Sequence, residues 1–277
     1  MNTEKIIDAI AANVPMPETE IVIDADGVKR CADCGRALET IVEFMNIKKK
    51  VPCVCDCTLK KIDAIKKQEE EEKKQDYIAH LRRTGFPEND FKNWTFENDD
   101  MSKPEITSIA KKYIENFKTF KNNGKGLLFY GTVGTGKTYA AAEIANALID
   151  AGKPVLMTNF TRIINKLQSS FEGRQEYIDG LNEFDLLILD DLAAERQTEY
   201  VLENVFNVID ARYRAKKPLI ITTNLTIEQL KNPENVATAR IYDRILERCF
   251  PVEVKGASNR RRKIAAEYDE TKTLLGL

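Results

Sequence analysis

The sequence predicts an α/β protein with a five-stranded parallel sheet, and three observations predict this fold class. Short, almost continuously apolar runs alternate with segments of helical periodicity from about residue 106 onward. Strands that are apolar on both faces are typical of parallel sheets covered by helices on each side. A glycine-rich motif also follows the first of these runs, and ligands of such sheets bind at the carboxyl ends of the strands. We therefore expect a ligand site at that motif.

The composition is that of a globular cytosolic protein rather than a membrane or secreted protein. The chain has 277 residues, enough for one large or two smaller domains, with 43% hydrophobic and 31% charged residues. It shows no apolar run near the ~20 residues of a membrane span and no signal peptide, so no membrane partner is expected. The net charge of −2 does not by itself indicate nucleic acid, although residues 240–263 are basic.

Residues 1–58 are predicted to form a zinc-binding domain, with an amphipathic helix at 1–10 and a short strand and turn at 20–28. Five of the six cysteines lie between residues 31 and 57, and clustered cysteines in a cytosolic protein indicate metal rather than disulfides. Two close pairs of thiolates complete a tetrahedral Zn²⁺ site, which supplies folding energy to a unit this small. Buried free cysteines are the alternative. The predicted ligands are Cys31, Cys34, Cys55 and Cys57, with Cys53 as an alternative because Cys-x-Cys-x-Cys offers three thiols for two places.

Residues 59–100 are predicted to be a charged helical linker. The helix at 59–83 has no apolar face in its middle, and helices that are polar all round usually bridge domains. Three aromatic residues follow in an irregular stretch, where they either clamp a nucleotide base or pack the linker onto the next domain. Packing is favoured because aromatic side chains bury large areas. These residues are Phe91, Trp94 and Phe96.

Residues 101–277 carry the alternating pattern and form the third predicted domain. Its helices are expected at 106–122, 139–151, 160–171, 201–215 and 236–248, with a basic helix after residue 258. Its strands are expected at 126–130, 154–158, 185–191, 217–224 and 250–254.

The glycine-rich motif after the first strand matches a phosphate-binding loop at every fixed position. Glycines remove Cβ atoms and permit positive φ, and the following helix N-terminus favours an anion. Lys137 is expected to contact the β- and γ-phosphates of ATP, and the Thr138 hydroxyl is expected to bind Mg²⁺. A turn that binds nothing is the alternative. The predicted nucleotide-binding residues are Gly131, Thr132, Val133, Gly134, Thr135, Gly136, Lys137, Thr138 and Tyr139.

A second part of the nucleotide site is predicted where the third strand ends. Four apolar residues precede Asp190 and Asp191, which is the Walker B pattern. Asp190 is expected to hold Mg²⁺ through water, and Asp191 to polarise the attacking water. Asn224 ends the next strand, where its amide orients that water or contacts the γ-phosphate. A helix cap is an almost equally good interpretation of Asn224.

With these motifs the chain resembles the AAA+ ATPases, and within them the DnaC/DnaI-type helicase loaders and the related IstB transposition ATPases. Residues 131–138 resemble Walker A, Asp190 and Asp191 resemble Walker B, and Asn224 resembles sensor 1. The resemblance implies that Arg244, with Arg240 as runner-up, is an arginine finger acting on a neighbouring subunit. It also implies that Arg260 is sensor 2. Asp191 stands where many AAA+ proteins have Glu, which bears on the turnover rate.

The resemblance implies partners as well. The paired cysteines and charged helix look like the amino-terminal domain with which loaders bind a hexameric replicative helicase. Single-stranded DNA is expected on the helix at 160–171, with Phe160 and Arg162 stacking on bases and Lys166 meeting phosphates. Phe160 fits a buried stripe equally well. The basic run at 260–263 is either a DNA surface or a solvated face.

The predicted function is therefore ATP-dependent loading of a hexameric helicase onto single-stranded DNA in the cytoplasm. ATP, Mg²⁺ and Zn²⁺ are the expected cofactors, and self-association through the ATP site is expected. Hydrolysis is expected to be slow and stimulated by DNA or a partner. The alternatives are an IstB-type ATPase partner of a transposase and a P-loop kinase or metabolic enzyme.

Overall fold

The computed structural model describes residues 12–15, 20–44, 47–87, 89–169, 173–193 and 198–275. The chain divides into two compact units at residues 1–75 and 76–277. The boundary lies within helix α2 (Asp56–Gly85), so the structure divides the chain differently from the predicted limits at 58 and 100. The predicted helix at 1–10 lies outside the described residues. Among those described, no helix is long and apolar enough to cross a membrane.

The first unit contains two antiparallel pairs of strands and the first part of α2. Strands β1 (Ile21–Ile23) and β2 (Lys29–Cys31) pair around a turn, in agreement with the predicted strand and turn. Strands β3 (Glu39–Phe44) and β4 (Ile47–Pro52) form a second pair that was not predicted. Exposed and half-buried positions alternate along β4, with Lys48 and Lys50 exposed and Lys49 half-buried on the other side.

Helix α2 runs for 30 residues, and its last part packs in the second unit. Leu81 and Phe86 are buried in the same cluster as residues of the parallel sheet. A short 3₁₀ helix, η1 (Asn89–Asn93), follows. The three aromatics of this stretch, Phe91, Trp94 and Phe96, are half-buried and pack against that cluster. The predicted packing role of these aromatics is therefore confirmed.

The predicted helix at 106–122 is two helices, α3 (Pro104–Glu115) and α4 (Phe117–Asn123). Asn116 lies between them with φ −101° and ψ 14°, and its side-chain amide donates to the Lys112 carbonyl. The local hydrogen bond of an Asn side chain competes with the helical ladder, which explains the break. Gly124 ends α4 in the left-handed conformation.

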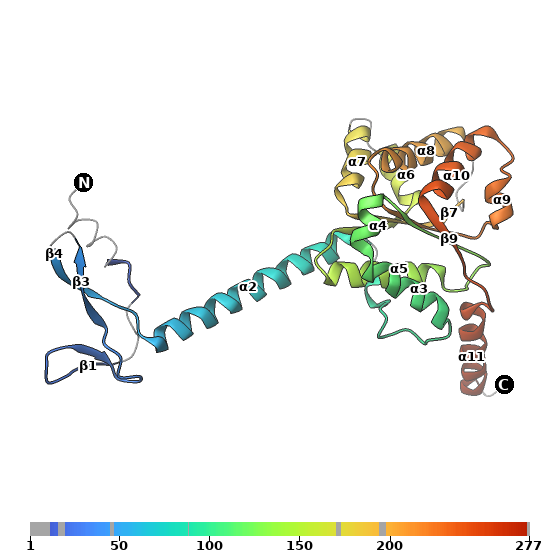
Figure 1. The fold of residues 1–277 in the computed structure, drawn as a ribbon. Coiled ribbons are helices and arrows are strands. Elements are labelled where there is room, and N and C mark those ends of the chain that lie inside the picture. Colours follow the sequence, from blue (N-terminus) through green and yellow to red (C-terminus); the bar gives the residue numbers. More distant parts are fainter. Residues whose placement is uncertain are drawn as a thin grey trace. The chain divides into compact units, whose positions relative to one another are not determined.

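The second unit is built on a five-stranded sheet in which every pairing is parallel, and this confirms the predicted fold class (Figure 1). The strand order is β6-β7-β8-β5-β9, so the strand before the phosphate loop has neighbours on both sides. The strands are β5 (Gly126–Tyr130), β6 (Val155–Asn159), β7 (Leu186–Leu192), β8 (Leu219–Thr223) and β9 (Cys249–Glu253).

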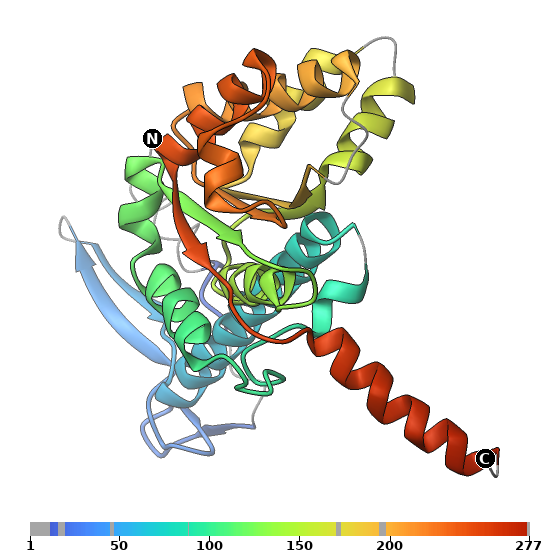
Figure 2. The same ribbon diagram turned by 90° about the vertical axis from the view of Figure 1, so that its right-hand side faces the viewer.

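Helices cover both faces of this sheet. Successive strand residues therefore belong alternately to two separate hydrophobic clusters, one on each face. Phe129 packs with α3, α4 and α5 (Lys137–Asp150), whereas Leu128 belongs to the cluster of the opposite face. Figures 1 and 2 show α3 and α5 on one side and α6, α8 and α10 on the other. The helices of that second face are α6 (Phe160–Ser169), α7 (Arg174–Gly180), α8 (Glu199–Arg214), α9 (Ile227–Lys231) and α10 (Val236–Arg248).

The chain continues from β9 into α11 (Asn259–Leu274). The Ser258 hydroxyl caps this helix by accepting a hydrogen bond from the Arg261 backbone N–H at 3.3 Å. Ser258 thus starts the basic helix at the predicted place.

Candidate functional site

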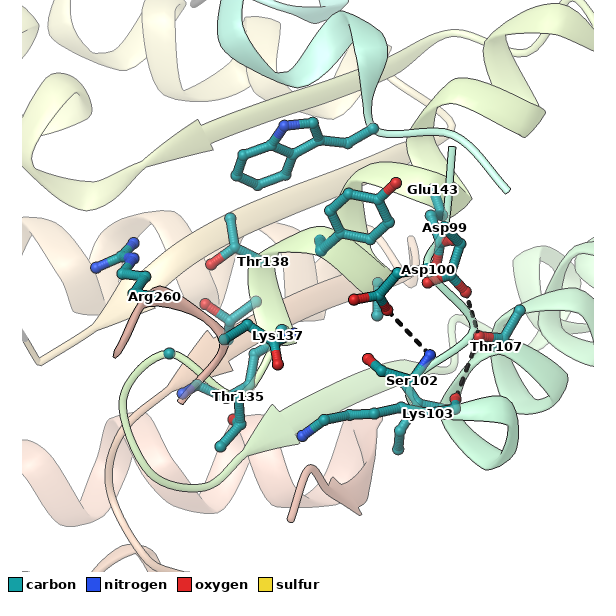
Figure 3. Close-up of a pocket in the computed structure, with 18 of the residues that line it drawn as sticks. Asp99, Asp100, Ser102, Lys103, Thr107, Thr135, Lys137, Thr138, Glu143 and Arg260 are labelled. Carbon is teal, nitrogen blue, oxygen red and sulfur yellow. Dashed lines mark hydrogen bonds between the residues drawn. The ribbon is translucent and has the colours of Figure 1, made fainter. Parts of the chain in front are cut away.

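A cavity of about 390 Å³ opens at the carboxyl ends of the central strands (Figure 3). One side is formed by the phosphate loop and the start of α5, and another by the ends of β7 and β8. The segment that precedes α3 and the start of α11 complete its walls. The structure thus brings together most of the predicted site residues, which are Val133, Gly134, Thr135, Gly136, Lys137, Thr138, Tyr139, Asp190, Asp191, Asn224 and Arg260.

The loop owes its shape to glycines with positive φ. Gly131, Gly134 and Gly136 have φ of 139°, 79° and 95°. A Cβ on Gly134 would lie 2.1 Å from the Ser258 Oγ, so any other residue would clash with the start of α11. The Asn259 backbone N–H also donates to the Gly134 carbonyl at 2.9 Å. The C-terminal helix is therefore packed directly on the phosphate loop.

Lys137 lies inside the loop. Its Nζ donates to the Gly131 and Thr132 carbonyls at 2.9 and 2.8 Å and to the Asn224 Oδ1 at 2.8 Å. Burial lowers the pKa of this ammonium, while the nearby carboxylates of Asp191 and Asp190 raise it. A buried cation held by loop carbonyls in the first turn of α5 is well placed to neutralise phosphate charge.

The two acids at the end of β7 have different environments. The Asp190 Oδ1 accepts a hydrogen bond from the Thr222 hydroxyl at 2.6 Å. Burial raises the pKa of Asp190, and hydrogen bonds from Thr222 and Thr138 oppose that shift. A carboxylate beside the Thr138 hydroxyl is a set of hard oxygen donors, which fits Mg²⁺.

Asp191 is exposed and has a left-handed backbone with φ 59°. Its backbone N–H donates to the Thr222 Oγ1 at 2.9 Å, and its Oδ1 accepts from the Asn224 Nδ2 at 3.0 Å. Asn224 therefore bridges Lys137 and Asp191, which favours its predicted role in the site over a helix cap. Thr222, which the sequence did not single out, orients both acids.

The other end of the cavity is lined by residues from before α3. The rings of Trp94 and Tyr139 are stacked, with centroids 5.4 Å apart and an interplanar angle of 23°. The Thr107 hydroxyl donates to the Asp99 Oδ2 at 2.7 Å. Lys103 donates to the Lys255 carbonyl, which ties this segment to the C-terminal part of the chain. Trp94 therefore lines the cavity in addition to packing on the core.

Glu143 also lines this end of the cavity, and sequence reasoning missed it. Its side chain is only 2% exposed. Burial first, and then repulsion by Asp99, raise the pKa of this carboxyl to about 8, with Lys111 opposing. A signal was present in the sequence, because Glu143 is a lone charged residue within Ala-Ala-Ala-Glu-Ile-Ala.

Arg244, the predicted arginine finger, is not part of the cavity lining of its own chain. Its Nε donates to the Asp210 Oδ1 at 2.8 Å, and its guanidinium lies 4.6 Å from the centroid of the Phe206 ring. Arg240 lies over the same ring at 4.7 Å, and Arg214 pairs with the other oxygen of Asp210 at 2.7 Å. The α8–α10 surface thus presents a cluster of arginines on acidic and aromatic partners.

One predicted DNA contact is wrong. Phe160 is fully buried among the residues of the second cluster, so its ring cannot stack on a base. Arg162 and Lys166 are exposed on α6, one turn apart, and line a second hollow with Tyr177. The end of the predicted helix, residues 170 and 171, lies outside the described residues, as do the side chains of the basic run at 262–263.

In the first unit, four cysteine sulfurs converge. Those of Cys31, Cys34, Cys55 and Cys57 all lie within 4.8 Å of one another. Sulfurs bound at about 2.3 Å to a tetrahedral zinc are about 3.8 Å apart, so this set fits Zn²⁺.

The protonation of these four cysteine thiols also favours a bound cation. A hydrogen bond with Cys34 that favours the neutral thiol, and then burial, raise the pKa of Cys57 to about 12, so a cation is needed to hold these groups as thiolates. Cys53 lies apart from this set, because its Sγ donates to the Ala37 carbonyl at 3.0 Å.

Comparisons with known proteins place the chain beside ATP-binding proteins. Residues 58–266 match the family described as IstB-like ATP binding protein. The replicative helicase loader DnaI of Bacillus subtilis is 26% identical over 210 residues, which cover 71% of this chain and 67% of the relative. A putative insertion sequence ATP-binding protein of Sinorhizobium fredii is 32% identical over 58% of this chain and 54% of its own. The chain thus spans about two thirds or less of the length of these relatives.

The crystal structure of a DnaI has the same fold. It superposes with a TM-score of 0.51 and 24% identity over 62% of this chain and 94% of that chain.

Proposed function

Because this chain belongs to the family of IstB-like ATP-binding proteins, we propose that it uses ATP to load a hexameric replicative helicase onto single-stranded DNA. The observation that carries the ATP part is the continuous contact from Lys137 through Asn224 to Asp191 at the mouth of the phosphate loop. The similarity to the DnaI loader over 71% of the chain supports the loading part. This role is a cytoplasmic one.

ATP is expected to bind with its phosphates over the loop. Lys137 exchanges its bond to Asn224 for the β- and γ-phosphates, which frees the Asn224 amide to orient water. Thr138 and Asp190 hold the Mg²⁺ that accompanies the nucleotide and neutralises its charge. Asp191 then accepts a hydrogen bond from the attacking water and polarises it. Arg260, at the start of α11, contacts the phosphates from the other wall.

Arg244 acts in trans in this proposal. Since it lies outside its own cavity, it can reach a γ-phosphate only in a neighbouring subunit. Its guanidinium is now paired with the Asp210 carboxylate. A phosphate oxygen would replace that carboxylate, because a guanidinium binds both groups with the same planar fork. Hydrolysis therefore depends on self-association through the ATP site, and it is expected to be slow until DNA or a partner aligns the subunits.

The remaining partners are assigned to the surfaces that bear suitable groups. The four-cysteine unit, with Zn²⁺, is the helicase-binding module. Arg162 stacks on a base of single-stranded DNA and Lys166 meets its phosphates, since both are exposed on α6.

An ATPase partner of a transposase is the second candidate. The observation that favours it is the 32% identity to an insertion sequence ATP-binding protein. That similarity covers 58% of the chain, whereas the similarity to DnaI covers 71%. The longer match makes the loader the better proposal.

A loading assay distinguishes the two candidates. The full-length protein is added with ATP to the replicative helicase of the same organism and to circular DNA coated with single-strand binding protein, and unwinding is measured. The loader proposal expects unwinding that requires the protein. It also expects Cys31→Ser to abolish retention of the helicase on a column while ATP binding continues. Stimulation of a transposase without any effect on the helicase would overturn the loader assignment.

A further inference from the structure

Helix α5 connects the phosphate loop to a buried carboxyl group at the far end of the same cavity. Glu143 follows Lys137 by six residues, which corresponds to about 9 Å along the helix axis. Both residues line the cavity. Figure 3 shows Glu143 with Asp99 and Thr107, on the side of the cavity away from Arg260. Glu143 therefore lies where the base of a nucleotide would lie if its phosphates occupied the loop.

The Glu143 carboxyl has an unused hydrogen-bonding atom. Its Oε1 is buried and has no hydrogen-bond partner among the described residues. A buried polar atom without a partner destabilises the folded protein. Native proteins rarely keep such atoms unless water, an ion or a ligand satisfies them. Because Glu143 lines the cavity, a turn of its carboxyl brings this buried oxygen within reach of a ligand group that donates a hydrogen bond.

The walls around Glu143 suit a flat heteroaromatic ring. Trp94 and Tyr139 present stacked aromatic rings, and Ile106 adds an apolar side chain to the same lining. Such a pocket binds the faces of a ring by stacking and reads its edge with a few polar groups. Glu143 supplies a carboxyl for that edge.

The protonation state of Glu143 selects the pattern of hydrogen bonds. With a pKa of about 8, raised first by burial and then by Asp99, the carboxyl is mostly neutral at pH 7. A neutral carboxyl has one O–H donor and one carbonyl acceptor. Adenine offers the matching pair, since its N1 accepts and its 6-amino group donates. Asp99 itself is engaged by the Thr107 hydroxyl.

We propose that Glu143 is the specificity residue of this pocket and that its carboxyl reads the amino edge of adenine in bound ATP. The inference rests on the proposed function only in that a nucleotide occupies this cavity. It assigns recognition of the base to α5, the same helix whose first turn binds the phosphates. A neutral carboxyl can also meet guanine by exchanging its two oxygens. The diagnostic ligand is therefore purine riboside triphosphate, which differs from ATP only by lacking the 6-amino group.

The test compares equilibrium binding of ATP and purine riboside triphosphate, with Mg²⁺, to four forms of the full-length protein. The wild type is expected to prefer ATP by about 5-fold, which corresponds to one hydrogen bond of about 1 kcal/mol. Glu143→Gln keeps the preference because its amide also has a donor and an acceptor. Glu143→Leu binds both ligands equally. Glu105→Leu, which removes an exposed carboxyl outside the cavity, behaves as the wild type.

Two results would overturn the inference. One is a wild type that binds the two triphosphates equally, a measurement that needs no variant. The other is a Glu143→Leu protein that still prefers ATP by the wild-type factor. Binding of purine riboside triphosphate to Glu143→Leu shows that this variant is folded. A wild type that binds neither triphosphate would overturn the proposed function, and this inference with it, so the two failures are distinguishable.

Discussion

The two units of this chain are held together in different ways. Among the described residues of the first unit, the buried hydrophobic ones are Cys31, Leu38 and Cys55, while Ile23 and Ile41 are 65% and 70% exposed. In the second unit two extensive clusters fill both faces of a parallel sheet. A unit with so small a core needs a metal or another crosslink to fold, whereas burial alone is enough for the other. Because of this difference, removing the metal should unfold the first unit and leave the second unit folded.

Metal removal is expected to have the largest effect, and it tests whether the fold of the first unit depends on zinc. A strong chelator, or Cys31→Ser with Cys34→Ser, should unfold the first unit, because zinc binding to four thiolates contributes on the order of 10 kcal/mol. The second unit should keep its fold and its ATP affinity. Elemental analysis, limited proteolysis and ATP titration of the same samples measure these outcomes. A first unit that stays protected without zinc would contradict the metal-dependent half of the comparison.

Arg244→Ala tests the second unit alone, with the next largest effect. ATP should still bind, but hydrolysis on DNA should fall about 10³-fold or more, as for other arginine fingers. Mixing the variant with Lys137→Ala should restore part of the activity, since each chain supplies what the other lacks. Arg214→Ala is the matched control, because Arg214 pairs with the same Asp210 carboxylate from an exposed position. Unchanged hydrolysis at saturating ATP in Arg244→Ala would remove it from the site.

Lys137→Ala should weaken ATP binding roughly 10- to 100-fold, the worth of a hydrogen-bonded charge on phosphate. The zinc content and the melting temperature should stay close to those of the wild type, because the ammonium bonds only to loop carbonyls and Asn224. Fluorescence titration with a labelled nucleotide gives the affinity. Equal affinity in wild type and variant would show that the phosphates bind elsewhere.

Cys53→Ser is expected to have the smallest effect on the first unit, and it tests which of the cysteines bind zinc. Cys53 donates to the Ala37 carbonyl rather than joining the four converging thiols, and a serine hydroxyl can make the same bond. Zinc content should be unchanged and stability should fall by less than about 1 kcal/mol. Cys55→Ser, two residues further on, should lose the metal. The reverse pattern would exchange the two residues in the ligand set.

The phosphate end of the site was predictable because its chemistry is local. Gly131, Gly136 and Lys137 stand at fixed spacing between a strand and a helix, and parallel strands bring Asp190 to the same edge. The base end was not predictable, because Trp94 and Asp99 come from the stretch before α3 and Glu143 from α5, and these two segments meet only through packing. Their cavity depends on how the stretch before α3 folds back on α5.

Other differences have similar physical causes. The β3–β4 pair escaped prediction because Lys48, Lys49 and Lys50 look like a solvated charge run, although the alternation along β4 is that of a half-exposed strand. The expectation that Phe160 stacks on a base comes from the family resemblance, whereas the apolar stripe of α6 in the sequence already fits the buried position that the structure shows. The break at Asn116 depends on one side-chain hydrogen bond, which helix propensity does not reveal.

Gly134 contacts the start of α11, so a structural change in the phosphate loop can be transmitted to this helix. The Asn259 N–H is bonded to the loop, and Ser258 fills the space that a side chain at 134 would need. A change in the loop therefore changes the anchor of a 16-residue helix. Tyr268, on that helix, is 67% exposed, so a fluorescent label there would respond to events about 15 Å further back along the axis. A label on α11 therefore allows a measurement of whether nucleotide binding at the phosphate loop changes the anchor of this helix.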